Sequence, residues 1–205
     1  MEDHCIYEYP AMLDLIINDT QKMGFDMASE PKTGSLLRAL AASKPNGKFL
    51  ELGTGTGLSA AWILSGMDKK STLTSVDNDP EAQSIALKYL GHDPRIKFVC
   101  KDGGTWLEKN ENQHYDFIFA DAWPGKFSHL ELLLNMLSIG GIYIIDDLLP
   151  QDNWPGGHAP RVLALMQEIE SNPNLTSSRM AWASGLMLVT KTCGAPIPRK
   201  SNQEN

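Results

Sequence analysis

Three alternate glycines, Gly53, Gly55 and Gly57, follow a short apolar run at residues 49–52 and precede a stretch with helical spacing. Because glycine has no Cβ, such a loop turns tightly and lets a ligand approach its main chain. A pyrophosphate loop usually has the spacing Gly-x-Gly-x-x-Gly, and here the residue at the last glycine position is Leu58. The loop therefore favours a ligand close to the backbone, although many such loops are only tight connections between a strand and a helix.

Aspartates follow the next four apolar runs along the chain: Asp77, Asp102, Asp121 and the pair Asp146-Asp147. In an open parallel sheet the carboxyl ends of the strands share one edge, and ligands bind there. The Asp77 carboxylate, 20 residues after the last glycine, can accept hydrogen bonds from both ribose hydroxyls of an adenosine. Each aspartate can instead cap the helix that follows it, but the whole set is more typical of a binding site.

A sheet must position these residues, and the chain alternates between short apolar runs and stretches of helical spacing. The predicted strands are residues 49–52, 73–77, 96–100, 117–120 and 142–145, and the helices between them are residues 58–67, 80–90, 105–109 and 128–137. Asp79-Pro80-Glu81 is a favourable helix start, with an aspartate cap and proline at the first helical position. The alternation predicts an α/β fold with a parallel sheet covered on both faces.

The segments on either side of this core are assigned in the same way. Two helices are expected ahead of the sheet, at residues 11–27 and 34–42. After the fifth strand, a Pro- and Gly-rich loop at residues 148–160 precedes a helix at 161–170 and β-like runs near 178–183 and 186–190. We expect one domain over residues 1–193, with N-terminal helices in 1–43, the core in 47–192, and a disordered tail at 194–205.

The composition is that of an ordinary globular chain of 205 residues, with 18 basic and 25 acidic side chains and a formal net charge of −7. No basic cluster is present, so a general affinity for nucleic acid or for an anionic membrane is not favoured. No apolar run reaches the roughly 20 residues that span a bilayer, and the N-terminal residues lack a signal-peptide pattern. We therefore expect a cytoplasmic protein. The three separated cysteines favour reduced thiols over disulfides or a zinc site.

The motif Glu51-x-Gly53-x-Gly55-x-Gly57, with the aspartates after the later strands, resembles the class I S-adenosylmethionine-dependent methyltransferases. More narrowly, from Pro31-Lys32-Thr33-Gly34 onward, roughly residues 30–192 are similar to the catechol O-methyltransferase-like small-molecule O-methyltransferases. The resemblance implies a doubly wound, mostly parallel seven-stranded sheet with an antiparallel last strand. It also implies methyl transfer from S-adenosylmethionine to a hydroxyl of a small molecule.

The resemblance assigns the cofactor site residue by residue. Glu51 and Gly53 would hold the methionine end, with Gly55, Ser59 and Asp121 nearby. Asp77 would bind the ribose, and Asp102, Gly103 and Trp123 would flank the adenine. An aromatic face can stack on a purine, which supports Trp123 independently, although an ordinary core tryptophan is the alternative.

The family also holds a divalent cation, and its ligand positions correspond here to Asp121, Asp146 and Asp147. Carboxylate oxygens suit Mg²⁺, Ca²⁺ or Mn²⁺ better than zinc, and the metal would lower the pKa of a substrate hydroxyl. In a regular strand Asp146 and Asp147 point to opposite faces, so they can share a metal only if the strand ends between them. The alternative is that these aspartates are helix caps or surface acids.

The chain departs from the family pattern at the candidate general base, a lysine expected three residues after Asp121. That position is Pro124, and the nearest lysine is Lys126, two residues later. Lys126 can still reach the site, where a nearby metal would depress its pKa, and we predict Lys126 and Asp121 as catalytic residues. A solvated lysine is an equally weighted alternative.

Residues 151–158 place Trp154 and His158 around two Pro-Gly turns, as in a lid over a substrate, although a plain surface loop is an equal alternative. His158 is a second candidate base that we leave out of the catalytic set. A homodimer through the N-terminal helices is reasonable by resemblance. Three other functions remain open: methylation of a nucleoside in tRNA or other RNA, nicotinamide-dependent oxidoreduction, and adenosine binding without catalysis.

Overall fold

The computed structural model describes residues 9–151 and 154–197, which form a seven-stranded sheet with the order β3-β2-β1-β4-β5-β7-β6. Strand β7 runs antiparallel to both of its neighbours, and the other neighbouring pairs are parallel. The strands are β1 (Lys48–Leu52), β2 (Thr72–Asp77), β3 (Ile96–Cys100), β4 (Tyr115–Ala120), β5 (Leu137–Ile145), β6 (Leu175–Met180) and β7 (Leu186–Lys191). The predicted doubly wound sheet with one antiparallel strand is confirmed.

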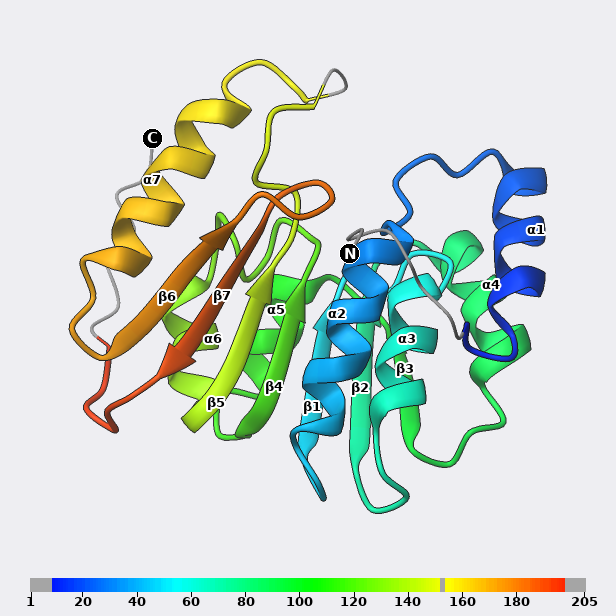
Figure 1. Ribbon diagram of the computed structural model, residues 1–205, viewed down its shortest axis with the longest axis horizontal. Helices are drawn as coiled ribbons and strands as arrows, with labels where there is room; N and C mark the ends of the chain where they lie inside the picture. The colour runs from blue at the N-terminus through cyan, green and yellow to red at the C-terminus, as the bar shows by residue number, and fades with distance from the viewer. Residues whose placement is uncertain (1–8, 152–153, 198–205) are drawn as a thin grey trace, which may run out of the picture.

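Helices cover both faces of the sheet (Figure 1). They are α1 (Leu13–Met23), α2 (Pro31–Ala42), α3 (Leu58–Gly66), α4 (Pro80–Leu90), α5 (Gly103–Lys109), α6 (Leu130–Met136) and α7 (His158–Glu170). The first four helices pack into one hydrophobic core, and α5, α6 and α7 pack into the other.

The alternation of strand side chains produces these two cores. Phe49 and Phe117 point to the face that α1 to α4 cover, while their neighbours Leu50 and Ile118 point to the face of α5 to α7. All four side chains are buried. Since both faces of the central strands are apolar, their polar chemistry is confined to the strand ends, which is the edge where the predicted site lies.

Local signals explain several element boundaries. The Asp79 carboxylate accepts hydrogen bonds from the backbone N–H groups of Glu81 and Ala82, and Pro80 occupies the first turn, so α4 begins as predicted. Helix α1 ends at Gly24, which adopts a left-handed conformation with φ +75°.

Several boundaries differ from the sequence prediction: α1 ends at Met23 and not at residue 27, and α2 and α7 each begin three residues earlier than predicted, at Pro31 and His158. Strand β5 begins at Leu137, five residues before the predicted start, because α6 passes directly into it. Strand β6 covers Leu175–Met180 and not residues 178–183, since the apolar Trp182 belongs to the following turn, where its indole N–H donates to the carbonyl of Lys32. An edge strand with the sequence LTSSRM carries little apolar signal.

The predicted tail begins within the described residues. The backbone N–H of Ile197 donates to the Asn135 side chain, which in turn donates to the Ile197 carbonyl. Residues 198–205 lie outside the described part of the chain, as do residues 1–8 of the predicted N-terminal segment. No helix within the described ranges is long and apolar enough to cross a membrane.

Candidate functional site

The glycine loop after β1 is fixed to its neighbouring strands by close backbone contacts. The Gly55 N–H donates to Asp77 Oδ2 over 2.7 Å, so the end of β2 holds the loop. Gly53 has φ +98°, and a Cβ at this position would lie 2.6 Å from the carbonyl oxygen of Asp121. The ends of β1 and β4 thus approach each other too closely for any larger residue at position 53.

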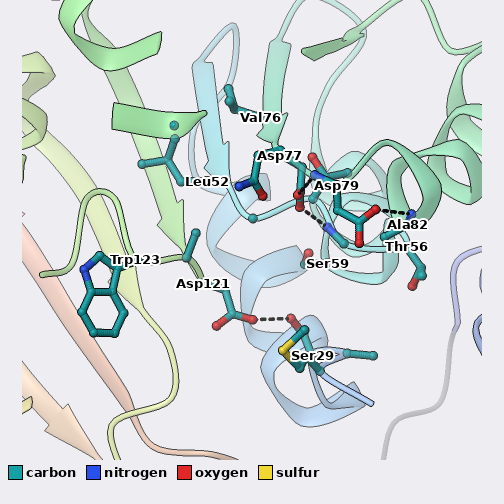
Figure 2. Close-up of a pocket in the computed structure, with 18 of the residues that line it drawn as sticks. Ser29, Leu52, Thr56, Ser59, Val76, Asp77, Asp79, Ala82, Asp121 and Trp123 are labelled. Atoms are coloured by element: carbon teal, nitrogen blue, oxygen red, sulfur yellow. Dashed lines mark hydrogen bonds between the residues drawn. The ribbon is translucent and has the colours of Figure 1, made fainter. Parts of the chain in front are cut away.

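A cavity of about 340 Å³ lies over this loop. Figure 2 shows Asp77, Ser59, Asp121 and Trp123 around it. The structure brings eight of the nine predicted cofactor residues to its lining: Gly53, Gly55, Ser59, Asp77, Asp102, Gly103, Asp121 and Trp123. The predicted residues thus share one cavity at the carboxyl edge of the sheet.

Glu51 is the ninth predicted residue, and it lies beneath the cavity with no exposed surface. The Ser75 hydroxyl donates to its Oε2 over 2.5 Å, whereas Oε1 has no hydrogen-bond partner among the described residues. Burial raises the pKa of Glu51 to about 7, against the opposing effect of the Ser59 and Ser75 hydroxyls. A carboxyl oxygen without a hydrogen-bond partner is able to accept a hydrogen bond from a bound ligand.

A chain of hydrogen bonds fixes the direction in which this carboxyl group is held. The Gln83 amide donates to the Thr54 hydroxyl, which lies 2.6 Å from the Ser75 hydroxyl. Since Ser75 donates its only proton to Glu51, Thr54 must donate to Ser75. All four residues are buried, so Glu51 acts as the final acceptor of an ordered network.

The remaining cofactor residues have partners of their own. Asp77 Oδ1 accepts from the Asp79 N–H, and Asp102 caps α5 by accepting from the Thr105 N–H. The capping role that was the alternative for Asp102 is therefore present, while its side chain still lines the cavity. Trp123 is 44% exposed, unlike a core tryptophan, and the Arg161 guanidinium lies 4.9 Å from the centre of its ring.

The segment between α1 and α2 lines the cavity, although the sequence analysis did not predict it as part of the site. Phe25, Met27, Ala28 and Ser29 line the cavity, and the Ser29 hydroxyl donates to Asp121 Oδ2 over 3.3 Å (Figure 2). The glycine loop is tied to α1 as well, through a 2.8 Å hydrogen bond between the hydroxyls of Thr20 and Thr56. The glycine and the acidic residues of this segment, Gly24, Asp26 and Glu30, match no binding motif by which the sequence would have identified it.

A second cavity, of about 530 Å³, adjoins the first. The two share the residues Met27, Ala28, Ser29, Asp121, Ala122 and Trp123 in their linings. The second cavity also contains Lys126, Asp146, Asp147, Trp154 and His158, all of which were candidates in the sequence. A molecule bound in one cavity would therefore face a molecule bound in the other across Asp121 and Trp123.

Lys126 is only 5% exposed, so it is not the solvated lysine of the alternative interpretation. Its Nζ lies 3.5 Å from Asp121 Oδ1 and donates to the backbone carbonyl of Asp146 over 3.2 Å. The structure thus joins the two predicted catalytic residues, Lys126 and Asp121, in an ion pair between the two cavities.

The side chains of the two aspartates after β5 accept hydrogen bonds from other groups of the same chain. Asp146 Oδ1 accepts from the Ser184 hydroxyl and from the Asp147 N–H. Burial, together with the nearby charge of Asp121, raises the pKa of Asp146 above the usual range of an aspartate. Both carboxylate oxygens of Asp147 accept from the Trp154 indole N–H, at 2.9 and 3.0 Å.

These contacts test whether the expected divalent cation fits. Strand β5 ends at Ile145, before Asp146 and Asp147, and Asp147 has a left-handed conformation with φ +62°. The two aspartates are therefore not forced to opposite faces of a regular strand, as sharing a metal requires. However, no three acidic, histidine or cysteine side chains of the described residues converge as a metal site. Asp121 is paired with an ammonium group and Asp147 with an indole. The donor set therefore does not fit the cation expected from the resemblance.

His158 begins α7 and packs within an aromatic cluster. Its ring centre lies 4.5 Å from that of Trp154 and 5.0 Å from that of Phe127. Neither ring nitrogen has a hydrogen-bond partner among the described residues, and Nε2 lies 3.9 Å from Asp147 Oδ2. Burial lowers the pKa of His158, against the opposing charge of Asp147. The His158 ring therefore favours its neutral form where it lines the second cavity.

Comparison with known proteins agrees with this geometry. The family model described as O-methyltransferase matches residues 2–192, and the chain belongs to this family. The membership inferred from the glycine motif and the strand-end aspartates is thereby confirmed.

Curated relatives carry the same description. The chain is 34% identical over 118 residues to the "Putative O-methyltransferase" of Mycobacterium sp. (strain KMS), a match that covers 54% of each protein. It is 30% identical over 146 residues to the protein of the same name from Mycolicibacterium vanbaalenii, covering 67% of this chain and 65% of the relative. The chain thus spans about half to two thirds of the length of the curated relatives it matches.

Solved structures share the fold at lower identity. The O-methyltransferase from Bacillus cereus, in complex with SAH, has a TM-score of 0.79 and 18% identity and covers 93% of this chain and 94% of its own. TomG from Streptomyces achromogenes, an O-methyltransferase involved in tomaymycin synthesis and solved with SAM, has a TM-score of 0.77 and 17% identity, with 92% of each chain covered.

Proposed function

We propose that this protein transfers the methyl group of S-adenosylmethionine to a hydroxyl oxygen of a small molecule. The observation that carries the proposal is the common wall of the two cavities, formed by residues 27–29 and 121–123. One cavity has the glycine loop and Asp77 of a nucleoside site, and the other has buried polar groups around a space for an acceptor. Such an arrangement positions two reactants against each other, which can contribute up to roughly 7–11 kcal/mol to catalysis.

The residues of the first cavity fit the cofactor. Gly53 lines this cavity, and a Cβ there would collide with the Asp121 carbonyl, so only glycine fits at this point of the cavity wall. Asp77 would hold the ribose hydroxyls, and Trp123 would lie against the adenine. Glu51 Oε1 has no hydrogen-bond partner among the described residues, so it would be able to accept a hydrogen bond from the methionine end of the cofactor.

The transfer requires an oxygen with an available electron pair. The acceptor oxygen forms a bond to the methyl carbon while the carbon–sulfur bond breaks and leaves its electron pair on sulfur. The hydroxyl proton passes to a base, which makes the oxygen a competent nucleophile. Lys126 was the predicted base, but its ammonium is engaged with Asp121 and the Asp146 carbonyl. The free ring nitrogens of His158 favour this residue as the proton acceptor.

Binding of S-adenosylhomocysteine to the wild-type protein tests the cofactor site. A ligand present at 100 times its dissociation constant stabilises the folded state by about 2.7 kcal/mol, which is visible as a rise in melting temperature. Asp77→Ala should remove the rise, because Asp77 both faces the cavity and holds the glycine loop. Asp14→Ala, on the exposed face of α1, is the control and should keep it.

An Asp77→Ala protein that binds the compound as tightly as wild type would show that the ribose assignment is wrong. Quenching of NADH fluorescence by the protein, without any shift from S-adenosylhomocysteine, would instead favour the nicotinamide-dependent alternative.

A further inference from the structure

The Lys126 ammonium lies against the Asp121 carboxylate and the backbone of Asp146, two of the three residues that the resemblance makes ligands of a divalent cation. Its Nζ contacts the Asp121 carboxylate at 3.5 Å and the Asp146 carbonyl at 3.2 Å. We propose that the Lys126 ammonium takes the place of a metal ion, and that the acceptor site of this protein works without one. This inference rests on the proposed function, since it concerns how the acceptor oxygen is held.

The two additional residues before Lys126 explain its position. Gly125 has φ +89°, and a Cβ there would lie 2.7 Å from a methyl group of Leu52, so the turn is pressed against the sheet. The Tyr143 hydroxyl donates to the Gly125 carbonyl over 2.6 Å, and the Lys126 N–H donates to the Trp123 carbonyl. The turn is thus anchored from the sheet below it, and the next side chain points inward instead of into solvent.

The donors of the Lys126 ammonium suit it to hold an acceptor oxygen. An ammonium group has three N–H donors, and two of those of Lys126 have partners among the described residues. The third is available to an acceptor oxygen in the second cavity, which Lys126 lines. A hydrogen-bonded positive charge stabilises the developing oxyanion, as a metal would.

The other predicted ligands are directed elsewhere. Asp121 uses its second oxygen to accept from Ser29, and Asp147 is held by the indole of Trp154. A divalent ion entering the site would have to displace an ammonium group from Asp121 and an indole from Asp147. Both exchanges oppose metal binding, because each leaves a part-buried donor without its partner.

Titration with Mn²⁺, followed by the electron paramagnetic resonance signal of the free ion, tests the inference on the full chain saturated with S-adenosylhomocysteine. The wild-type protein should leave the free Mn²⁺ signal unchanged. Lys126→Met removes the ammonium, so it should bind Mn²⁺ at least about tenfold more tightly than wild type, or about 1.4 kcal/mol. Lys126→Arg keeps the charge and should resemble wild type, as should Lys101→Met at an exposed lysine.

One Mn²⁺ per wild-type chain, lost on Asp121→Asn, would overturn the inference, and so would a Lys126→Met protein with no gain in affinity. The melting shift from S-adenosylhomocysteine, measured on the same samples, separates the two proposals. Its absence in the wild-type protein contradicts the proposed function, whereas its presence together with bound Mn²⁺ contradicts only the role of Lys126.

Discussion

At the scale of single residues, the site depends on carboxyl groups whose environments differ sharply. Asp77 and Asp102 line the first cavity and accept hydrogen bonds from backbone N–H groups, while Glu51 and Asp146 are buried. Burial without full hydrogen bonding disfavours the charged form of a carboxyl group. The burial of Glu51 and Asp146 therefore lowers the stability of the folded state, while it fixes the positions of both side chains in the site.

Glu51 makes this cost measurable through pH. Its folded-state pKa of about 7 lies above the ordinary glutamate value of 4.5, so between these two pH values the folded state keeps a proton that the unfolded state has lost. Stability from this group is fully present below pH 4.5 and is lost as pH rises to 7, by about 3 kcal/mol. Between pH 5 and pH 8 the free energy of unfolding in urea should fall by roughly 2–3 kcal/mol less in Glu51→Gln than in wild type, because part of the loss has already occurred at pH 5.

Comparing how steeply the free energy of unfolding falls with pH in the two proteins removes the contributions that they share. One of these comes from Asp146, whose raised pKa acts in the same direction. Glu81→Gln, at an exposed glutamate in α4, should retain the wild-type dependence on pH. Equal slopes in wild type and Glu51→Gln would mean that Glu51 is already ionised in the folded protein.

At the scale of secondary-structure elements, the position of His158 at the start of α7 determines its chemistry. The first turn of a helix carries partial positive charge, which disfavours a protonated imidazole, and burial lowers the pKa of His158 further. The ring is thus neutral at neutral pH, and as the proposed base it would lose activity only below the ordinary histidine value of 6.5.

Single-turnover methyl transfer to a phenolic acceptor is the measurement that tests this role. His158→Asn should slow the chemical step by roughly 10²–10⁴-fold and remove the acid limb of the pH profile. The melting shift from S-adenosylhomocysteine should not change, since His158 lies outside the cofactor cavity. His92→Asn, at an exposed histidine, is the control. A loss below about fivefold would return the role of base to Lys126 or to solvent.

The elements also show why much of the site was predictable. Asp77, Asp121 and Asp146 converge because each follows a parallel strand, and this order needs only the alternation of strands and helices. The segment over the cavity was not predictable in the same way, since Phe25 and Ser29 reach the site through the packing of α1 and α2. The inward direction of Lys126 depends on the contacts of Gly125 with Leu52 and Tyr143, which no local pattern encodes.

Partners explain the other differences between prediction and structure. Asp146 and Asp147 follow β5 as the metal prediction requires, but their side chains accept hydrogen bonds from Ser184, 38 residues further along the chain, and from Trp154, seven residues further along. Trp154 comes from the candidate lid, whose residues 152–153 lie outside the described part of the chain. Residue type and strand order therefore predict which groups meet, while the charge balance among them requires the folded structure.

At the scale of the whole molecule, electrostatics distinguish a small acceptor from RNA. The formal charge is −7, and the second cavity is lined by five acidic residues and one lysine: Asp26, Glu30, Asp121, Asp146, Asp147 and Lys126. A polyanion approaching this cavity would be repelled, and a protein that bound one through 6–10 phosphates would lose roughly 10³–10⁵ in affinity between 50 and 200 mM salt. We expect instead that turnover of a small acceptor changes less than about twofold over this range, because surface charges steer it weakly. Filter binding should retain no tRNA even at the lower salt concentration, whereas retention with a steep dependence on salt would favour the RNA methyltransferase alternative over the small-molecule one.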